Sequence, residues 1–167
     1  MPGRTSLPHT RVHDQRGLST STALHRPHSR QPLTGIEISE DMLTRARSTY
    51  SREMEAGRMH LAEGALTALP LADHSLDAAI TVNTLYFVPE LDAACTELAR
   101  VVRPGGHLVI GIGDADAMAK MPFTAYGFTL RPVGEVIDAL KRAGCSVAHH
   151  ELPNPPIPHH LLIATPA

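Results

Sequence analysis

Residues 97–112, ELARVVRPGGHLVIGI, carry a helix directly into a buried strand. Before the turn at 103–106, apolar residues recur at the three- and four-residue spacing of one helix face. Pro104 ends that helix, and glycine supplies the positive φ that a tight turn requires. Residues 107–112 are mostly aliphatic, which is typical of a strand in the core. The stretch therefore predicts a helix packed against a central strand of an α/β sheet.

Strands and helices also alternate on the amino-terminal side of this stretch. Residues 33–38 form a β-branched run, and Ser39 can cap a following helix that ends at Gly57. One apolar face of that helix repeats every four residues: Met42, Ala46, Tyr50 and Met54. Residues 59–63 and 77–82 predict two more strands, the second buried on both faces.

On the carboxyl-terminal side, a helix begins at Pro132 and ends at Gly144. Strands at 145–152 and 160–164 then follow with no helix between them, so they can pair antiparallel. Alternating strands and helices imply right-handed crossovers between parallel strands. We predict an α/β fold: a Rossmann-like, mainly parallel sheet with helices on both faces and a C-terminal antiparallel hairpin.

The composition limits the class of protein. A chain of 167 residues suits one domain, and a net charge of −2 gives no nucleic-acid footprint. No apolar run approaches the ~20 residues of a membrane span, so we expect no membrane partner. Two cysteines cannot form a disulfide framework and suit a reducing, cytoplasmic location.

The first 31 residues differ from the remainder. They carry five arginines against one acid, and they are rich in His, Pro, Ser and Thr. Without periodic apolar residues the segment cannot offset its ordering entropy, so we predict a disordered basic tail at 1–31 and a domain at 32–167. An organellar transit peptide has a similar composition, but the prolines and Gly17 interrupt any long amphipathic helix.

Four stretches within 33–166 together resemble a class I S-adenosylmethionine-dependent methyltransferase of the small-molecule type. They are TGIEIS with Met42 and Leu43, GALTALP with SLD, VNTLYF, and LARVVRPGGHLV, at residues 34–43, 64–77, 82–87 and 98–109. Their order and spacing carry the resemblance, and the terminal hairpin agrees with it. The resemblance implies S-adenosyl-L-methionine as cofactor and a small-molecule methyl acceptor.

The resemblance also implies cofactor-binding residues. Glu37, with Ile38 beside it, would accept hydrogen bonds from the ribose hydroxyls at the tip of a strand. Gly64, Ala65 and Leu66 would approach the adenine through backbone N–H groups. Many relatives carry an acid at the position of Ala65, so adenine recognition here would rest on the backbone. Leu66 fits a plain core position equally well.

Further candidates follow later strands. Asn83 would lie near the methyl donor and Tyr86 near the acceptor, although a capping Asn and a packed Tyr explain both equally well. Tyr126, in a semi-apolar stretch before the last helix, is a second substrate candidate, with loop packing as the alternative. The catalytic residues are unknown from the sequence. Aligning the two reactants contributes about 7–11 kcal/mol by itself, so a methyltransferase can lack an obvious catalytic acid or base.

The paired histidines do not predict a metal site. His149-His150 and His159-His160 are strand neighbours that point to opposite faces, and the sequence marks no third ligand. We therefore expect no metal.

The strand that should precede Glu37, with its glycine-rich turn, is missing from the pattern. The upstream residues offer only Gly3 and Gly17 and no apolar run. Either 1–31 is out-of-frame sequence joined to a truncated domain, or another chain supplies the strand, or a degenerate strand is present. Loss of the first, central strand would leave its neighbours unpaired, favouring self-association.

Three functions follow. The first is a methyltransferase whose activity is impaired by the missing glycine-rich loop. The second is a non-catalytic remnant or interaction module that pairs through its open sheet. The third is a nicotinamide-dependent oxidoreductase, in which Glu37 would also suit a ribose; the terminal hairpin and the missing glycines count against it.

Overall fold

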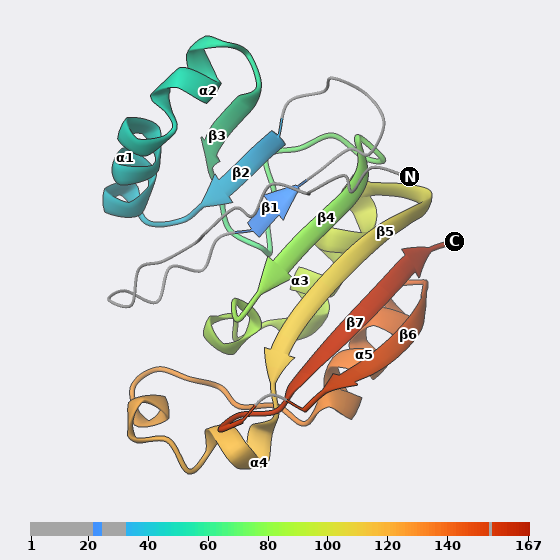
Figure 1. Cartoon of the computed structure of the whole chain (residues 1–167). Coiled ribbons are helices and arrows are strands. Elements are labelled where there is room, and N and C mark those ends of the chain that lie inside the picture. Colours follow the sequence, from blue (N-terminus) through green and yellow to red (C-terminus); the bar gives the residue numbers. More distant parts are fainter. Residues whose placement is uncertain (1–21, 25–32, 154) are drawn as a thin grey trace, which may run out of the picture.

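A seven-stranded sheet with the order β3-β2-β1-β4-β5-β7-β6 forms the centre of the molecule (Figure 1). It is seen in a computed structural model that describes residues 22–24, 33–153 and 155–167. The parallel pairs are β2 with β3 and β4 with β5, and the terminal β6–β7 hairpin is antiparallel. The strands are β1 Thr22–Leu24, β2 Leu33–Glu37, β3 Met59–Glu63, β4 Leu76–Val82, β5 Val102–Gly113, β6 Cys145–Leu152 and β7 His159–Pro166.

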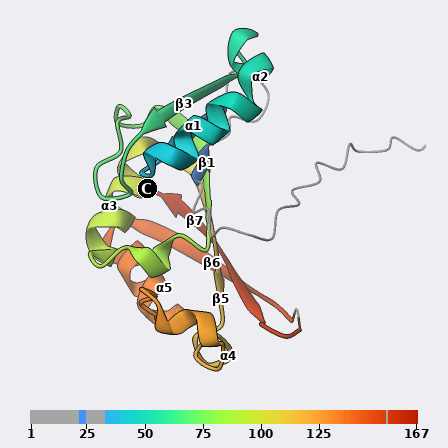
Figure 2. The ribbon, with the colours of Figure 1, turned by 90° about the vertical axis from the view of Figure 1, so that its left-hand side faces the viewer.

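The helices connect these strands and cover the sheet. The described helices are α1 Glu40–Thr49, α2 Ser51–Glu55, α3 Leu91–Val101, α4 Ala115–Met118 and α5 Val133–Arg142, with 3-10 turns η1 Leu85–Phe87 and η2 Pro122–Ala125. Figure 2 shows α3, α4 and α5 on the same side of β5 and β7. None of the helices in the described ranges is long and apolar enough to cross a membrane. The predicted α/β, Rossmann-like fold with its C-terminal hairpin is confirmed, but the sheet is mixed and not mainly parallel: β1 pairs antiparallel with β2 and β4, and β7 pairs antiparallel with β5 and β6.

The main core lies between the sheet and the layer of α3 and α5. Helix α3 contributes Ala94, Cys95 and Leu98, and all three side chains are fully buried. They pack with the alternate residues of β5 and β7 that face the same side, Leu108, Ile110, Leu162 and Ala164. Burial raises the pKa of the Cys95 thiol to about 12, so it behaves as a small apolar core residue.

The central position of the sheet is occupied, which corrects the prediction that its first strand is missing. β1 lies between β2 and β4 and runs antiparallel to both, with Ala23 opposite Gly35 on one side and Ile80 on the other. The backbone N–H and C=O groups of β2 and β4 need partners, and a strand of either direction supplies them. The rest of the predicted tail, 1–21 and 25–31, lies outside the described residues.

Strand β4 is buried on one face, not on two as its apolar sequence predicted. Ala79 and Thr81 face the core and are 1% exposed, whereas Ile80 and Val82 are 38% and 43% exposed. Side chains alternate along a strand, so these two apolar residues lie on the side opposite α3.

One other local prediction needs correction, and one is confirmed with added detail. The helix expected from Met42 to Met54 is two helices, α1 and α2, which meet at Tyr50, and Leu43 is the buried residue of α1. Ser39 caps α1 as predicted, since its side chain accepts the N–H of Met42. Residues 103–106 fall within the bounds of β5 but bulge from its pairing with β4, which passes from Val102 opposite Leu76 to His107 opposite Ala78. Gly105 has the predicted positive φ, at 71°, and a Cβ at Gly106 would lie 2.7 Å from the carbonyl oxygen of Asp77.

Candidate functional site

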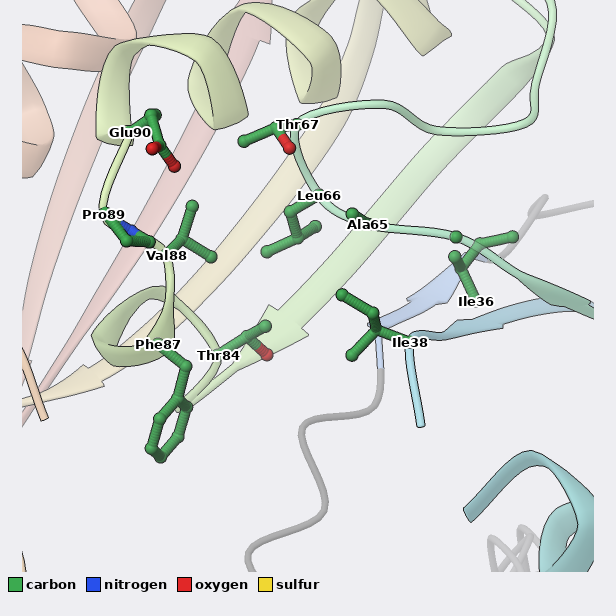
Figure 3. A pocket seen from close by; sticks show the side chains of 11 residues that line it. Ile36, Ile38, Ala65, Leu66, Thr67, Thr84, Phe87, Val88, Pro89 and Glu90 are labelled. Atoms are coloured by element: carbon green, nitrogen blue, oxygen red, sulfur yellow. The ribbon is translucent and has the colours of Figure 1, made fainter. Parts of the chain in front are cut away.

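A cavity of about 230 Å³ opens where β2 and β4 reach their carboxyl ends (Figure 3). Parallel α/β sheets bind ligands at this edge of the sheet. Figure 3 shows Ile38, from the end of β2, and Leu66, from the loop after β3, extending into this space from different elements. The residues around it are Ile36, Ile38, Gly64, Ala65, Leu66, Thr67, Thr84, Phe87, Val88, Pro89 and Glu90.

The 64–68 turn forms one side of the cavity and lies close to β2. The N–H of Gly64 donates to the carbonyl oxygen of Glu37 at 3.1 Å, and the N–H of Ala68 donates to that of Ala65 at 3.0 Å. A Cβ at Gly64 would lie 2.6 Å from Cδ of Pro70 and 3.0 Å from Cγ2 of Ile36. Glycine is therefore required here for close packing.

The Glu97–Arg100 pair of α3 holds the rest of this loop. Arg100 donates to both carboxylate oxygens of Glu97 at 2.8 Å, and to the carbonyl oxygens of Leu69 and Leu71 at 3.2 and 2.9 Å. Glu97 in turn accepts the N–H of Leu69 at 3.0 Å. The Arg100 guanidinium holds the pKa of Glu97 below its ordinary range. The loop is thus attached to a core helix.

The opposite side of the cavity, at 85–90, is held by Arg131. This side chain is 8% exposed, and it donates to the carbonyl oxygens of Leu85 and Val88 at 2.8 Å and of Pro89 at 3.0 Å. The sequence did not reveal this role, since an arginine before a proline gives no sign of which carbonyls it will meet. Arg100 and Glu97 were missed for the same reason.

Glu37 lies at the carboxyl end of β2 but outside the cavity lining. It is 8% exposed, and its Oε1 accepts the N–H of Ser39 at 3.0 Å. Ile38, the next residue, is 65% exposed and does line the cavity. Of the predicted cofactor-binding residues, Ile38, Gly64, Ala65 and Leu66 are thus gathered around one space, and Glu37 lies next to Ile38 in the chain but outside the lining.

Asn83 and Tyr86 form a hydrogen-bonded group that joins β4 to β5. Asn83 has a positive φ of 57°, and its N–H donates to the carbonyl oxygen of Gly111 at 2.9 Å. The Tyr86 hydroxyl donates to Oδ1 of Asn83 at 3.3 Å and accepts the N–H of Gly113. Tyr86 is 4% exposed, and burial raises its pKa. Neither side chain lines the cavity.

The semi-apolar stretch before α5 packs on itself and on η1. Phe128 makes edge contacts with Phe87 and Phe123, at centroid distances of 4.7 and 5.7 Å, and a tilted contact with Tyr86. Tyr126 is 80% exposed and away from the cavity lining. The structure therefore brings Tyr86, but not Tyr126, next to elements that form the site.

His149 of the first histidine pair lies close to His160 of the second, although we expected the two pairs not to converge. His149 on β6 and His160 on β7 lie with Glu151 so that one ligand atom of each is within 4.8 Å of the others. The antiparallel register brings them together, since it places Glu151 directly opposite His160. The spacing of residues along β6 alone does not show which residue of β7 lies opposite.

Comparison with known proteins shows which family the sequence is similar to. A family model described as a methyltransferase domain matches residues 17–110, more than half of the chain. The O-methyltransferase cnsE of Penicillium expansum is 38% identical over 90 residues, covering 54% of this chain and 31% of that protein. A demethylmenaquinone methyltransferase of Desulfitobacterium hafniense is 35% identical over 77 residues, covering 46% and 30%. The chain spans about a third of the length of such relatives.

Solved structures share the fold at low identity. A geranyl diphosphate methyltransferase in complex with S-adenosylmethionine aligns with a TM-score of 0.69 at 13% identity, over 82% of this chain and 69% of that one. The [4+2]-cyclase SpnF aligns with a TM-score of 0.68 at 17% identity, over 81% and 67%. A methyltransferase and a cyclase on one fold show that the architecture alone does not decide the chemistry.

Proposed function

The chain belongs to the methyltransferase domain family, the class I S-adenosylmethionine-dependent methyltransferases, and from this premise we propose that its cavity binds the adenosine part of the cofactor. The observation that carries the proposal is the gathering of Ile38 and the 64–66 turn around one space at the carboxyl ends of the strands. S-Adenosylmethionine is the cofactor that this family membership implies.

The size and lining of the cavity suit part of the cofactor. Pockets for drug-sized ligands occupy about 300–1,000 Å³, so a cavity of about 230 Å³ accommodates a portion of such a molecule. Ile38 and Leu66 supply apolar surface for the faces of an adenine ring, while Thr67, Thr84 and Glu90 supply polar groups. A flat base between aliphatic side chains, with few polar contacts at its edge, is consistent with this lining.

Glu37 remains the proposed partner of the ribose. One carboxylate oxygen accepts the Ser39 N–H, and an ionised carboxylate has about four acceptor positions in total. The ribose hydroxyls would therefore add to the existing hydrogen bond. Because Glu37 is 8% exposed, we expect it to orient the sugar at the rim of the cavity and not to react.

We infer that the reaction transfers a methyl group to a small-molecule acceptor. S-Adenosylmethionine supplies an activated methyl group when bound, and the chain contributes mainly by aligning donor and acceptor. Asn83 and Tyr86 lie past the end of β4, and their mutual hydrogen bond supports a positioning role there. The relatives include several O-methyltransferases, which favours an oxygen acceptor on a small molecule.

The competing functions have less support. An interaction module was inferred from an open central position in the sheet, and β1 occupies that position. A nicotinamide-dependent oxidoreductase does not account for the family match over 17–110.

Isothermal titration calorimetry of the full chain with S-adenosylmethionine and S-adenosylhomocysteine tests the proposal. Ile38→Asp places a charge in the cavity at an exposed position, so the fold should persist while affinity falls at least tenfold. Leu152→Asp, an exposed aliphatic position on β6, is the matched control and should bind as the wild type does. If neither ligand binds the wild-type chain, the cavity is not a cofactor site. Micromolar binding would also contradict the expectation that an absent glycine-rich loop impairs the domain.

A further inference from the structure

Three metal-ligand side chains converge on the terminal hairpin, away from the cavity. His149 and Glu151 are alternate residues of β6, and His160 comes from β7. Alternate residues of a strand share a face, and the register pairs Glu151 with His160 and His149 with Leu162. Both histidines and the glutamate therefore lie on one face at the same end of the hairpin.

The distances between these groups match the needs of one small ion. Nε2 of His149 lies 3.0 Å from Nδ1 of His160, and one ligand atom from each of the three residues lies within 4.8 Å of the others. Tetrahedral zinc binds nitrogen at about 2.0–2.1 Å, which separates two of its ligand atoms by roughly 3.3 Å. Small side-chain rotations would bring all three atoms into one coordination sphere.

The carboxylate of Asp114, which is not one of these three residues, also supports a metal site here. Nε2 of His160, the ring nitrogen that faces away from His149, lies 3.5 Å from Oδ2 of Asp114. Asp114 is fixed, because its Oδ1 accepts the N–H of Ala117 at 2.9 Å and its own N–H donates to the carbonyl oxygen of Pro158 at 2.8 Å. A metal-bound histidine commonly donates its second ring N–H to such a carboxylate. A proton on Nε2 leaves Nδ1 with a lone pair directed at His149.

A hydrogen bond between the two imidazole rings would explain only part of this arrangement. It accounts for the contact between His149 and His160. It does not explain why the Glu151 carboxylate lies close to both rings, or why the Asp114 carboxylate lies close to His160. Two imidazoles and one carboxylate are a donor set that zinc and similar ions accept. His149 and Glu151 are exposed, so water can fill the remaining position.

We propose that His149, Glu151 and His160 bind one divalent transition-metal ion of the zinc type, with Asp114 orienting His160. The ion joins β6 to β7 at the end of the hairpin that lies next to its connecting loop. Through Asp114, which follows β5 directly, it also joins the hairpin to the central part of the sheet. This site is independent of the proposed cofactor cavity.

Zinc binding to the full chain, prepared without a polyhistidine tag, tests the proposal. The chain has 11 histidines, so single-site variants are compared and not the total zinc bound. His149→Gln removes an exposed ligand without disturbing the core, and His150→Gln removes its exposed neighbour on the opposite face of β6. We expect calorimetry with Zn²⁺ to show one site that is weakened at least tenfold in His149→Gln and unchanged in His150→Gln.

Two further measurements distinguish a built site from surface histidines. Co²⁺ should give visible absorption typical of a low-coordinate site in the wild type, and His149→Gln and Glu151→Gln should lose it. Asp114→Asn should weaken Zn²⁺ binding by about 10–100-fold although it removes no ligand. Equal Zn²⁺ affinities in the wild type, His149→Gln and His150→Gln would overturn the proposal, as would a Co²⁺ spectrum identical to that of the free ion.

Discussion

Arg131 donates a hydrogen bond from Nη1 to the carbonyl oxygen of Leu85 at 2.8 Å, across 46 residues of sequence. Its Nη2 reaches the carbonyl oxygens of Val88 and Pro89, and its Nε lies 3.3 Å from the Glu135 carboxylate. One buried guanidinium therefore fixes the segment that carries Phe87, Val88, Pro89 and Glu90 into the cavity. The shape of the cavity depends on a residue that does not line it.

Replacing Arg131 by Met should destabilise the protein by about 2–4 kcal/mol, since three carbonyl groups lose a charged donor while the side-chain volume is nearly kept. Chemical denaturation measures the loss. Arg142→Met is the control, because Arg142 pairs with Asp92 at the surface, where both side chains are more than half exposed. That change should cost less than about 1 kcal/mol. Equal effects of the two variants would show that Arg131 does not hold the segment.

Tyr86→Phe should cost about 1–2 kcal/mol, because the buried N–H of Gly113 loses its acceptor and the ring otherwise stays in place. Tyr126→Phe removes a hydroxyl from a side chain that is 80% exposed and should have no measurable effect. Thermal unfolding of the two variants, measured side by side, makes the comparison. A neutral Tyr86→Phe would contradict a structural role for this hydroxyl and favour a contact with the methyl acceptor.

Gly64→Ala should lower stability by about 1–3 kcal/mol and weaken cofactor binding, because the new methyl group collides with Pro70 and Ile36 and displaces the turn. The control is Gly134→Ala in α5, where a Cβ meets no heavy atom within 4 Å. Alanine is the better helix former, so this control should be neutral or stabilising by up to about 1 kcal/mol. Calorimetry and denaturation on both variants separate loss of binding from loss of folding.

Glu97→Gln should show a pH-dependent cost. The pKa of Glu97 is depressed in the folded protein by Arg100, so its ionised form stabilises the fold at pH values above the unfolded pKa of about 4.3. That contribution is lost as the pH falls through the lower, folded value. The difference in unfolding free energy between wild type and Glu97→Gln should therefore be larger at pH 7 than at pH 3. Glu55→Gln, at an exposed position of α2, serves as the reference; a difference independent of pH would argue against the ion pair.

Local patterns in the sequence predicted most of the elements correctly. The aliphatic run at 107–112 lies within β5, residues 59–63 are β3, and the two strands after Gly144 form the predicted hairpin. Each of these depends on neighbouring residues: an apolar run, a cap, or a glycine after a helix. The resemblance to class I methyltransferases, and not these local patterns, pointed to Ile38 and to the 64–66 turn, which the fold brings to one cavity.

Predictions that depended on distant partners were less successful. No local pattern indicated that residues 22–24 would occupy the central position, because three residues without an apolar run carry no strand signal of their own. Their neighbours β2 and β4 provide the unpaired backbone groups that make a strand there favourable. Arg131 and the Arg100–Glu97 pair were missed because their partners lie on other elements.

The amino-acid sequence by itself determined the class of fold, because periodicity, caps and glycines act over a few residues, and the order of its motifs indicated the family by resemblance. Only the tertiary structure decided that Tyr86 is buried between Asn83 and Gly113, that Arg131 shapes the cavity, and that His149 meets His160 and Glu151. These relationships depend on strand register and on side chains that are far apart in sequence. Their energies come from hydrogen bonds that exist only once the sheet is assembled.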